Sequence, residues 1–354
     1  MRRLILAVSV LLAACGKVTP APTALPTVAV TQSAPTAIPI TEAAPTIEIA
    51  PTAAETATPA PNIPRLVLIT ESSEPNASVQ VVMQAAAQEF GWGYTLVQNA
   101  APNALEEAAL MGGPVLVLDG AAVTEYARPI AHGYRGHYFI ALSPLQGPVV
   151  STNLLALEGE RFDQLGFLAG MAAGFATETQ RVAAVADTSV EGLNYRNGFL
   201  HGVRYTCPRC EVKFFEAGDV AAGLYTDVVF VAPGETQAAV LASAAQAGAW
   251  VIGAGQAFAN GATPGADKLL MSVSLDVGAA VDTAVRNYYA ATLGQGFTLT
   301  GQWPLSAQTG ALVITSFDTP ALNSLDHQEI ITAYGRLADG SLDTGVDPAT
   351  GQEK

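Results

Sequence analysis

The chain has 354 residues, of which 50% are hydrophobic and 13% are charged, and its formal net charge is −15 at pH 7. An acidic chain of this kind argues against nucleic acid as a partner, and it gains nothing from anionic lipid headgroups. After the first 63 residues, the remaining length is sufficient for one large domain or for two lobes of ordinary size.

The first 14 residues have the organisation of a secretory signal peptide. Arg2 and Arg3 precede an apolar run from Leu4 to Ala14, which is too short to cross a bilayer because a spanning helix needs about 20 residues. Cys15 follows small residues, and this arrangement resembles the lipobox of bacterial lipoproteins, in which the cysteine is diacylated and becomes the first mature residue. An ordinary signal peptide with an incidental cysteine is the alternative. The resemblance implies a location at the cell membrane, outside the cytoplasm, with acyl chains such as palmitate as the only attachment.

Residues 15–63 are expected to form the lipid anchor and an unfolded tether. The segment consists mainly of Pro, Thr, Ala, Val and Ser, has no aromatic residue, and repeats the unit Ala-Pro-Thr. Each proline removes a backbone donor and fixes φ, so neither a helix nor a sheet extends through the segment. The tether is either a semi-rigid polyproline II spacer or a plain disordered linker. Both alternatives place the folded part after residue 63.

Short apolar runs alternate with amphipathic segments from residue 64 onward, which is typical of an α/β protein with parallel strands. The first series predicts a lobe formed by residues 64–155 together with about 275–310. Its predicted strands are 66–69, 94–97, 115–118, 138–142 and 149–155, and its predicted helices are 77–90, 105–111, 123–131 and 277–293.

The second series predicts another lobe, formed by residues 156–274 together with about 311–335. Its predicted strands are 181–186, 211–215, 227–232, 250–253, 269–275 and 311–315, and its predicted helices are 160–175, 193–205, 236–247 and 322–334. Helix 160–175 is rich in glycine and alanine, so we expect it to pack closely on a neighbour. The late returns of the chain predict more than one crossing between the lobes. Residues 336–354 are left as a C-terminal tail.

Cys207 and Cys210 form a Cys-Pro-Arg-Cys motif between a predicted helix and a predicted strand. A disulfide is expected in an exported chain, and free thiols or a redox pair are the alternatives. A zinc site would need a second cysteine pair, and the four histidines have no ligand spacing, so we expect no metal. We also expect no cofactor.

Five segments, taken in order, resemble the basic membrane protein (BMP) family. The first contains Glu158-Gly159 and Leu168-Ala169-Gly170, and the others are 197–203, 227–236, 248–253 and 270–274. Members of this family are substrate-binding lipoproteins of ABC importers, and several bind purine nucleosides. The resemblance implies a two-lobed type I periplasmic-binding-protein fold, with parallel sheets flanked by helices and three hinge crossings. It also implies ABC permease and ATPase subunits as partners, and no enzymatic activity.

The expected ligand site follows from a rule for open parallel sheets, whose ligands bind outside the carboxyl ends of the strands. The rule selects Ser72, Ser73 and Asp119 in the first lobe, and Asp187, Ser189, Gly234, Glu235, Thr236 and Gln256 in the second. Asn194 and Tyr195 open the helix after Asp187, and we expect them to face the cleft as well. The carboxylates suit ribose hydroxyls or a cationic ligand, and Tyr195 can stack on a base or sugar. Each of these residues has an alternative role as a helix cap or turn residue.

Two motifs of the nucleoside-binding relatives are not matched. The relatives have a ribose-binding aspartate after the strand that corresponds to 250–253, whereas this chain has Ala254-Gly255-Gln256. Their first loop is replaced here by the shorter segment 71–76. The leading hypothesis is a lipid-anchored protein that holds a nucleoside or a related small polar solute in the cleft between its lobes. The alternative is a surface lipoprotein that binds no ligand and acts in envelope interaction or sensing.

Overall fold

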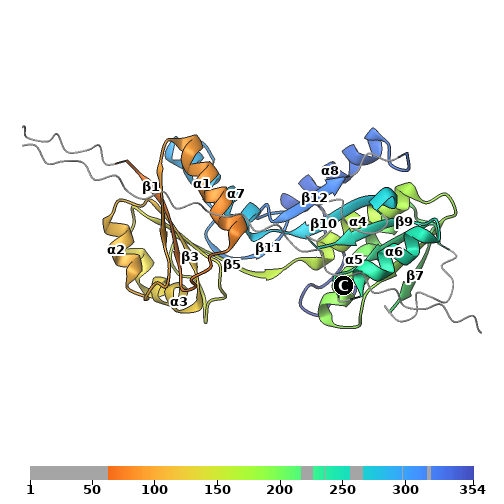
Figure 1. Ribbon diagram of the computed structural model, residues 1–354, viewed down its shortest axis with the longest axis horizontal. Helices are drawn as coiled ribbons and strands as arrows, with labels where there is room; N and C mark the ends of the chain where they lie inside the picture. Colours follow the sequence, from red (N-terminus) through yellow and green to blue (C-terminus); the bar gives the residue numbers. More distant parts are fainter. Residues whose placement is uncertain (1–62, 217–225, 235, 256–265, 297, 317–319) are drawn as a thin grey trace, which may run out of the picture. The chain divides into compact units, whose positions relative to one another are not determined.

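The computed structural model describes residues 63–216, 226–234, 236–255, 266–296, 298–316 and 320–354. Cys15, the predicted signal peptide and all but the last residue of the predicted tether lie outside this part of the chain. The described residues form two six-stranded sheets with helices on both faces of each sheet (Figure 1). Each sheet is the centre of one lobe.

The sheet of the first lobe is parallel throughout and has the strand order β11-β5-β4-β3-β1-β2. Its strands are β1 (Arg65–Thr70), β2 (Gly93–Val97), β3 (Val115–Asp119), β4 (Tyr138–Ala141), β5 (Leu154–Glu160) and β11 (Gly301–Leu305). Its helices are α1 (Ala77–Phe90), α2 (Ala104–Leu110), α3 (Ala121–Ile130), the 3-10 turn η1 (Ala131–Gly133) and α7 (Val277–Thr292).

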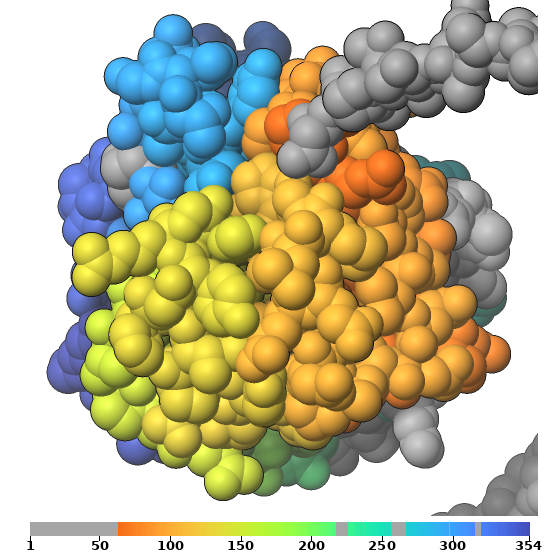
Figure 2. All heavy atoms as spheres, turned by 90° about the vertical axis from the view of Figure 1, so that its left-hand side faces the viewer, coloured from red at the N-terminus to blue at the C-terminus, as the bar shows by residue number. Residues whose placement is uncertain are grey.

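Alternate residues of β1 face opposite layers of the first lobe. Leu66 and Leu68 pack with α1 and α7, whereas Val67 and Ile69 pack with α2 and α3. A strand that is buried on both faces has no polar alternation, which is why this segment is continuously apolar. Figure 2 looks onto this lobe and shows the light-blue segment around α7 beside the orange and yellow segments of residues 63–160.

The sheet of the second lobe has the strand order β12-β10-β9-β8-β6-β7, and only β12 runs antiparallel to its neighbour. Its strands are β6 (Arg181–Val185), β7 (Glu211–Phe215), β8 (Val228–Val231), β9 (Trp250–Ala254), β10 (Leu269–Leu275) and β12 (Leu312–Ser316). Its helices are α4 (Phe162–Ala176), α5 (Val190–Thr206), α6 (Gln237–Gln246), the 3-10 turn η4 (Ala266–Lys268) and α8 (Ser324–Ala338). Helices α4, α5 and α8 share one hydrophobic core, and α6 packs on the other face of the sheet.

The chain passes between the two sheets three times. It leaves the first sheet from β5 into α4, returns from β10 into α7, and leaves again from β11 into β12. The first and third crossings are joined by the backbone amide of Arg161, which donates to the carbonyl oxygen of Leu305 at 3.0 Å. The predicted two-lobed α/β architecture with three crossings is therefore confirmed.

Helices α4 and α5 approach each other through glycines on both sides, as the composition of helix 160–175 predicted. Gly166 and Gly170 of α4 lie against the backbone of α5, and Gly198 and Gly202 of α5 lie against the backbone of α4. A Cβ atom at Gly202 would lie 2.8 Å from the carbonyl carbon of Phe167, and closer still to its oxygen. The two helices can pack at this separation only because these positions have no side chain.

The end of the chain is folded onto the second lobe. Helix α8 extends to Ala338, so the predicted tail begins within a helix, and residues 343–354 (the C-terminal strap) lie along α5. The Thr344 hydroxyl donates to the buried Asp163 carboxylate, and Asn197 Nδ2 donates to the Gly351 carbonyl at 2.6 Å. Glu353 accepts from His201 and Arg204 at 3.1 and 3.5 Å.

Several predicted boundaries are wrong by two residues or more, those of β5, α3, α4, α5 and α8 among them, and one strand was not predicted. Strand β5 comprises residues 154–160 and not 149–155. The prediction followed the apolar residues and missed the polar end of the strand, which leads into the first crossing. Helix α4 accordingly begins at Phe162 and not at 160. Strand β11 contains a proline, which an edge strand tolerates because one side of it needs no ladder partner.

Candidate functional site

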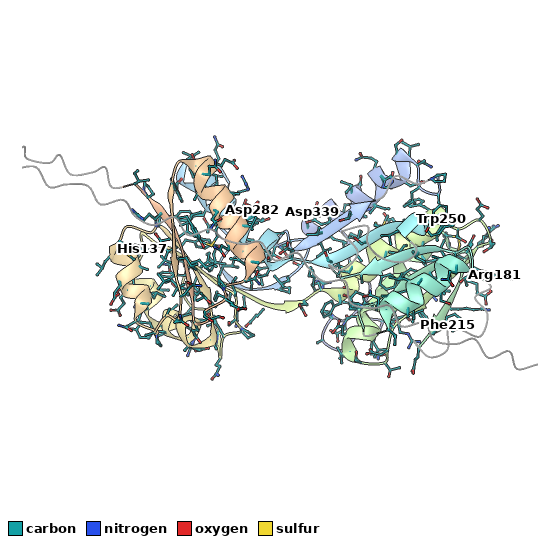
Figure 3. All side chains as sticks on the ribbon, in the orientation of Figure 1. His137, Arg181, Phe215, Trp250, Asp282 and Asp339 are labelled. Atoms are coloured by element: carbon teal, nitrogen blue, oxygen red, sulfur yellow. A yellow bond between two sulfur atoms is a disulfide. The ribbon has the colours of Figure 1, made fainter. Side chains whose placement is uncertain are left out.

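Two adjoining pockets lie at the carboxyl ends of β6 and β8 in the second lobe. Val185 of β6 pairs with Val231 of β8, so the segments that leave these strands run side by side. In Figure 3, Arg181 and Trp250 mark the opposite, amino-terminal end of the same sheet. The larger pocket has a volume of about 190 Å³ and the smaller about 80 Å³. They share Asp187, Ala232 and Pro233 as lining residues.

Asp187 and Ser189 are fixed by a short chain of hydrogen bonds at the start of α5. Asp187 Oδ1 accepts from the backbone amide and the hydroxyl of Ser189, at 3.0 and 2.5 Å. The Ser189 hydroxyl oxygen in turn accepts from the backbone amide of Gly192 at 3.0 Å and caps the helix. Asp187 Oδ2 has no hydrogen-bond partner among the described residues, so one carboxylate oxygen of this residue, which lines both pockets, is free to accept from a ligand.

The start of α6 forms one wall of the larger pocket. Gly234 and Thr236, both predicted, line it together with Gln237, which was not predicted. Gln237 is 9% exposed, and its Nε2 donates to the carbonyls of Val231 and Ala254 at 3.0 and 2.6 Å, which ties the ends of β8 and β9 together. In the sequence, a glutamine at the first position of a helix looks like an ordinary solvent-facing residue. The only signal that could have marked Gln237 as a pocket residue is its position shortly after the end of β8.

Tyr195 and Glu191 line the smaller pocket, and Glu191 was also not predicted. Tyr195 is 2% exposed, and its ring lies 5.1 Å from that of Phe162 and 5.9 Å from that of Phe230. Burial raises the pKa of Tyr195, and the carboxylates of Glu191 and Glu160 raise it further. The pKa of Glu191 is also raised, first by burial and then by the charges of Glu160 and Asp187.

Asn194, which was also predicted to contact the ligand, lines neither of the two pockets. This buried side chain donates through Nδ2 to the carbonyls of Val190 and Pro348, at 2.9 and 3.0 Å, and therefore contacts the C-terminal strap instead of a pocket. The contact joins residues 154 positions apart, and the spacing of the sequence gives no sign of it.

The first-lobe residues lie together at the carboxyl ends of β1 and β3, where Thr70 pairs with Asp119. The Asp119 carboxylate accepts from the Thr70 hydroxyl at 3.4 Å. Ser72 and Ser73 are exposed in the turn after β1, and the Ser72 hydroxyl oxygen accepts from the backbone amide of Glu74 at 3.0 Å. The helix cap of α1 is Asn76 and neither serine. Glu235 and Gln256 lie outside the described residues.

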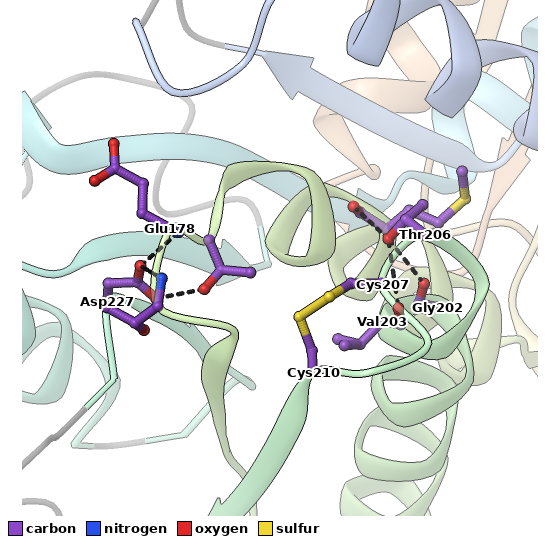
Figure 4. The surroundings of a disulfide bond; sticks show 10 residues. Glu178, Gly202, Val203, Thr206, Cys207, Cys210 and Asp227 are labelled. Atoms are coloured by element: carbon purple, nitrogen blue, oxygen red, sulfur yellow. Dashed lines mark hydrogen bonds between the residues drawn. A yellow bond between two sulfur atoms is a disulfide. The ribbon is translucent and has the colours of Figure 1, made fainter.

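Cys207 and Cys210 are joined by a disulfide, with their Cα atoms 5.4 Å apart. Figure 4 shows the bond at the C-terminal end of α5, beside Thr206. Ser189 caps the other end of this 17-residue helix, about 25 Å away at 1.5 Å per residue. The disulfide is therefore separate from the pockets.

The described residues include neither a membrane-spanning helix nor a metal-binding cluster. No helix in this part of the chain is long and apolar enough to cross a membrane. The same residues contain no group of three or more His, Cys, Asp or Glu side chains arranged to hold a metal ion.

Two lobes of this topology, with polar residues gathered at the carboxyl edges of their sheets, define a solute-binding protein of the periplasmic-binding class. The family described as "Bmp: ABC transporter substrate-binding protein PnrA-like" matches residues 73–331. The chain belongs to this family, and the resemblance found in the five sequence segments is confirmed. It is an extracytoplasmic solute-binding protein of the ABC-transporter type, and the family is one of binding proteins and not of enzymes.

Two solved structures support the fold. The solute-binding protein of an ABC transporter system from Conexibacter woesei is 18% identical, with a TM-score of 0.53 over 79% of this chain and 98% of that chain. A protein from Bacillus halodurans, described as a transcriptional activator of the comK gene, is 16% identical, with a TM-score of 0.52 over 79% and 99%. At these identities the similarity shows the fold alone. No curated protein matches the chain.

Proposed function

We propose that this protein is a lipid-anchored receptor that binds a small polar solute and delivers it to the permease and ATPase subunits of an ABC importer. The observation that carries the proposal is the convergence of Asp187, Ser189, Gly234 and Thr236 on two adjoining pockets. These residues come from separate β–α units, and the sheet brings them together at the edge where such folds bind ligands.

The ligand in this proposal is a small polar solute, nucleosides included, held between the lobes. A combination of fixed hydrogen-bonding groups and apolar walls is typical of small-molecule sites. Asp187 supplies a fixed carboxylate, and Val185, Ala186, Val231 and Ala232 supply apolar surface. Ser72, Ser73 and Asp119 occupy the equivalent edge of the first sheet and are proposed to contact the same ligand.

A ligand screen tests this proposal. The full-length protein, purified free of ligand, would be melted with nucleosides, bases, sugars and amino acids. A true ligand at 100 times its dissociation constant should add about 2.7 kcal/mol to the free energy of unfolding. The shift should disappear in Asp187→Ala and persist in Glu329→Ala, which removes an equal charge from an exposed position on α8. A folded protein that responds to no small solute would refute the proposal and favour the alternative of an envelope-interaction lipoprotein.

The anchor has a separate test. The proposal assigns acylation to Cys15, because this residue follows the apolar run and precedes the proline-rich tether. Cells that express the protein should incorporate labelled palmitate into it, and Cys15→Ser should abolish the label and release the protein from the membrane fraction. Equal labelling of the variant and the unchanged protein would show that Cys15 is not the anchor.

A further inference from the structure

The charged side chains that line the two pockets are all acidic. Asp187 borders both pockets and Glu191 borders the smaller one, and no lysine, arginine or histidine is among their described lining residues. Glu160 lies near enough to Glu191 for its charge to raise the Glu191 pKa. Two carboxylates, those of Asp187 and Glu191, therefore border the smaller pocket, and the Glu160 carboxylate at the end of β5 acts on Glu191 from the first crossing.

The nearby cations are engaged in other contacts. Arg161 donates from Nε and Nη2 to the Asp163 carboxylate, at 2.7 and 2.8 Å. The guanidinium of Arg196 lies over the Phe214 ring, 4.6 Å from its centroid. Neither arginine lines a pocket, so neither provides a direct partner there for Asp187 or Glu191.

Two buried polar side chains border the same pockets with an atom left unpaired. The hydroxyl of Tyr195 has no hydrogen-bond partner in the described part of the chain, although the residue is 2% exposed. The amide nitrogen of Gln237 is fully used by two backbone carbonyls, and its amide oxygen has no partner among the described residues. Neither atom is among the buried unpaired atoms of the described residues, so both remain accessible to a molecule in the pockets, which can supply the missing partner.

The unpaired atoms are predominantly acceptors. Asp187 Oδ2, the Glu191 carboxylate and Gln237 Oε1 can only accept, and the Tyr195 hydroxyl can accept or donate. A protonated amine offers up to three donors and a positive charge, whereas a hydroxyl in the same place offers one donor and no charge.

We propose that these pockets select solutes that carry a protonated amine, with Asp187 and Glu191 as the charged partners of the ammonium group. The inference rests on the proposed function, because it names the class of solute that the receptor binds. It places the ammonium where the two pockets meet, at Asp187, and the uncharged remainder of the solute against the apolar wall of the larger pocket.

The test uses pairs of solutes that differ only in the exchange of a hydroxyl for an amine. Glucosamine with glucose, and 5′-amino-5′-deoxyadenosine with adenosine, would be titrated calorimetrically into the full-length protein slightly below neutral pH. In at least one pair, the amine should bind about tenfold or more tightly than its neutral twin. Raised ionic strength should reduce this preference, because the pockets are open to screening by salt.

Asp187→Asn and Glu191→Gln should each reduce the preference to less than about threefold, and Glu329→Gln should retain it. The melting temperature of each variant without ligand establishes that it is folded. Equal or tighter binding of the neutral twins would overturn the inference and leave the proposed function intact. An amine preference that survives both substitutions would overturn the assignment to these residues. Binding of no solute in either pair or in the wider screen would overturn the inference and the proposed function together.

Discussion

The close contact between α4 and α5 leads to a prediction in which one type of substitution has opposite effects at two helical glycines. At Gly202, an added methyl group would lie 2.8 Å from the carbonyl carbon of Phe167 and 3.0 Å from the backbone nitrogen of Met171. At Gly335, in the exposed part of α8, a built Cβ atom has nothing within 4 Å. Gly202→Ala and Gly335→Ala therefore form a matched pair.

The expected magnitudes follow from two opposing terms. Replacing glycine by alanine within a helix gains about 1 kcal/mol from backbone propensity. Overpacking of a close contact costs about 1–3 kcal/mol, and the upper end applies at Gly202 because the neighbouring atoms are backbone and cannot rotate away. Gly202→Ala should therefore lower the free energy of unfolding by about 2 kcal/mol, and Gly335→Ala should raise it by up to about 1 kcal/mol.

Thermal denaturation of the two variants and the unchanged protein measures this difference. For a protein of this size, the two midpoints should differ by on the order of 5–10 °C. Hydrogen exchange should be faster in α4 and α5 of Gly202→Ala and unchanged there in Gly335→Ala. If Gly202→Ala were as stable as Gly335→Ala, the helices would not be held at the separation described, and the reasoning from glycine packing would be refuted.

Three further predictions concern polar and covalent contacts of the second lobe. Asp163→Asn should destabilise the protein by about 3 kcal/mol, because it removes the charge of a buried carboxylate that pairs with Arg161. The same substitution should speed proteolysis within residues 343–354, because the contact between Asp163 and Thr344 holds this segment on the lobe. An unchanged cleavage rate would contradict this role of Asp163. Burial raises the pKa of Asp227, but hydrogen bonds from Thr177, Thr179 and Glu178 outweigh it, and the pKa lies below its ordinary value of 3.8. A carboxylate whose pKa is lower in the folded than in the unfolded state stabilises the fold at pH values above its unfolded pKa. Asp227→Asn should therefore be less stable than the unchanged protein at pH 7, and in melts over a series of pH values this difference should shrink as the pH falls below about 3.8. A difference that stays constant with pH would contradict the lowered pKa of Asp227. Replacing both Cys207 and Cys210 by serine should cost about 2 kcal/mol or less in urea denaturation, since the closed loop is short, and should leave solute binding unchanged; lost binding would show that the bond affects the pockets.

Most of the fold could be predicted from local pattern. Helix α1 and strands β7 and β10 have the predicted boundaries, because each is an apolar or amphipathic run, and α1 and β10 are followed by the cap residues Gly91 and Asp276. Strand β11 was missed because its sequence, Gly-Gln-Trp-Pro-Leu, has a proline and no apolar alternation. Its place in the sheet comes from pairing with β5, about 145 residues earlier, and no local signal reports such a pairing.

The candidate site was predictable to the extent that it follows from the strand ends. Asp187, Ser189, Gly234 and Thr236 line the pockets because each comes directly after a parallel strand. Tyr195 is also at the pocket, although it lies in the second turn of α5 and not at a strand end. Asn194 is its neighbour in sequence and was assigned by the same reasoning, but it faces the C-terminal strap. Neighbouring residues of a helix point in different directions, and the surroundings of each depend on what packs against that side. Asn194 points to the side that the C-terminal strap covers, and the strap is formed by the last 12 residues of the chain.

The three crossings also determine the order in which the two lobes can be completed while the chain is synthesised from its N-terminus. The first sheet has five of its strands by residue 160, but its sixth strand and helix α7 come only between residues 277 and 305. The second sheet in turn waits for β12, and α8 and the strap follow. Neither lobe is a continuous stretch of sequence, so a nascent chain that is released early would carry two unfinished sheets with exposed edges. Truncation from the C-terminus should therefore damage both lobes before it reaches residue 277.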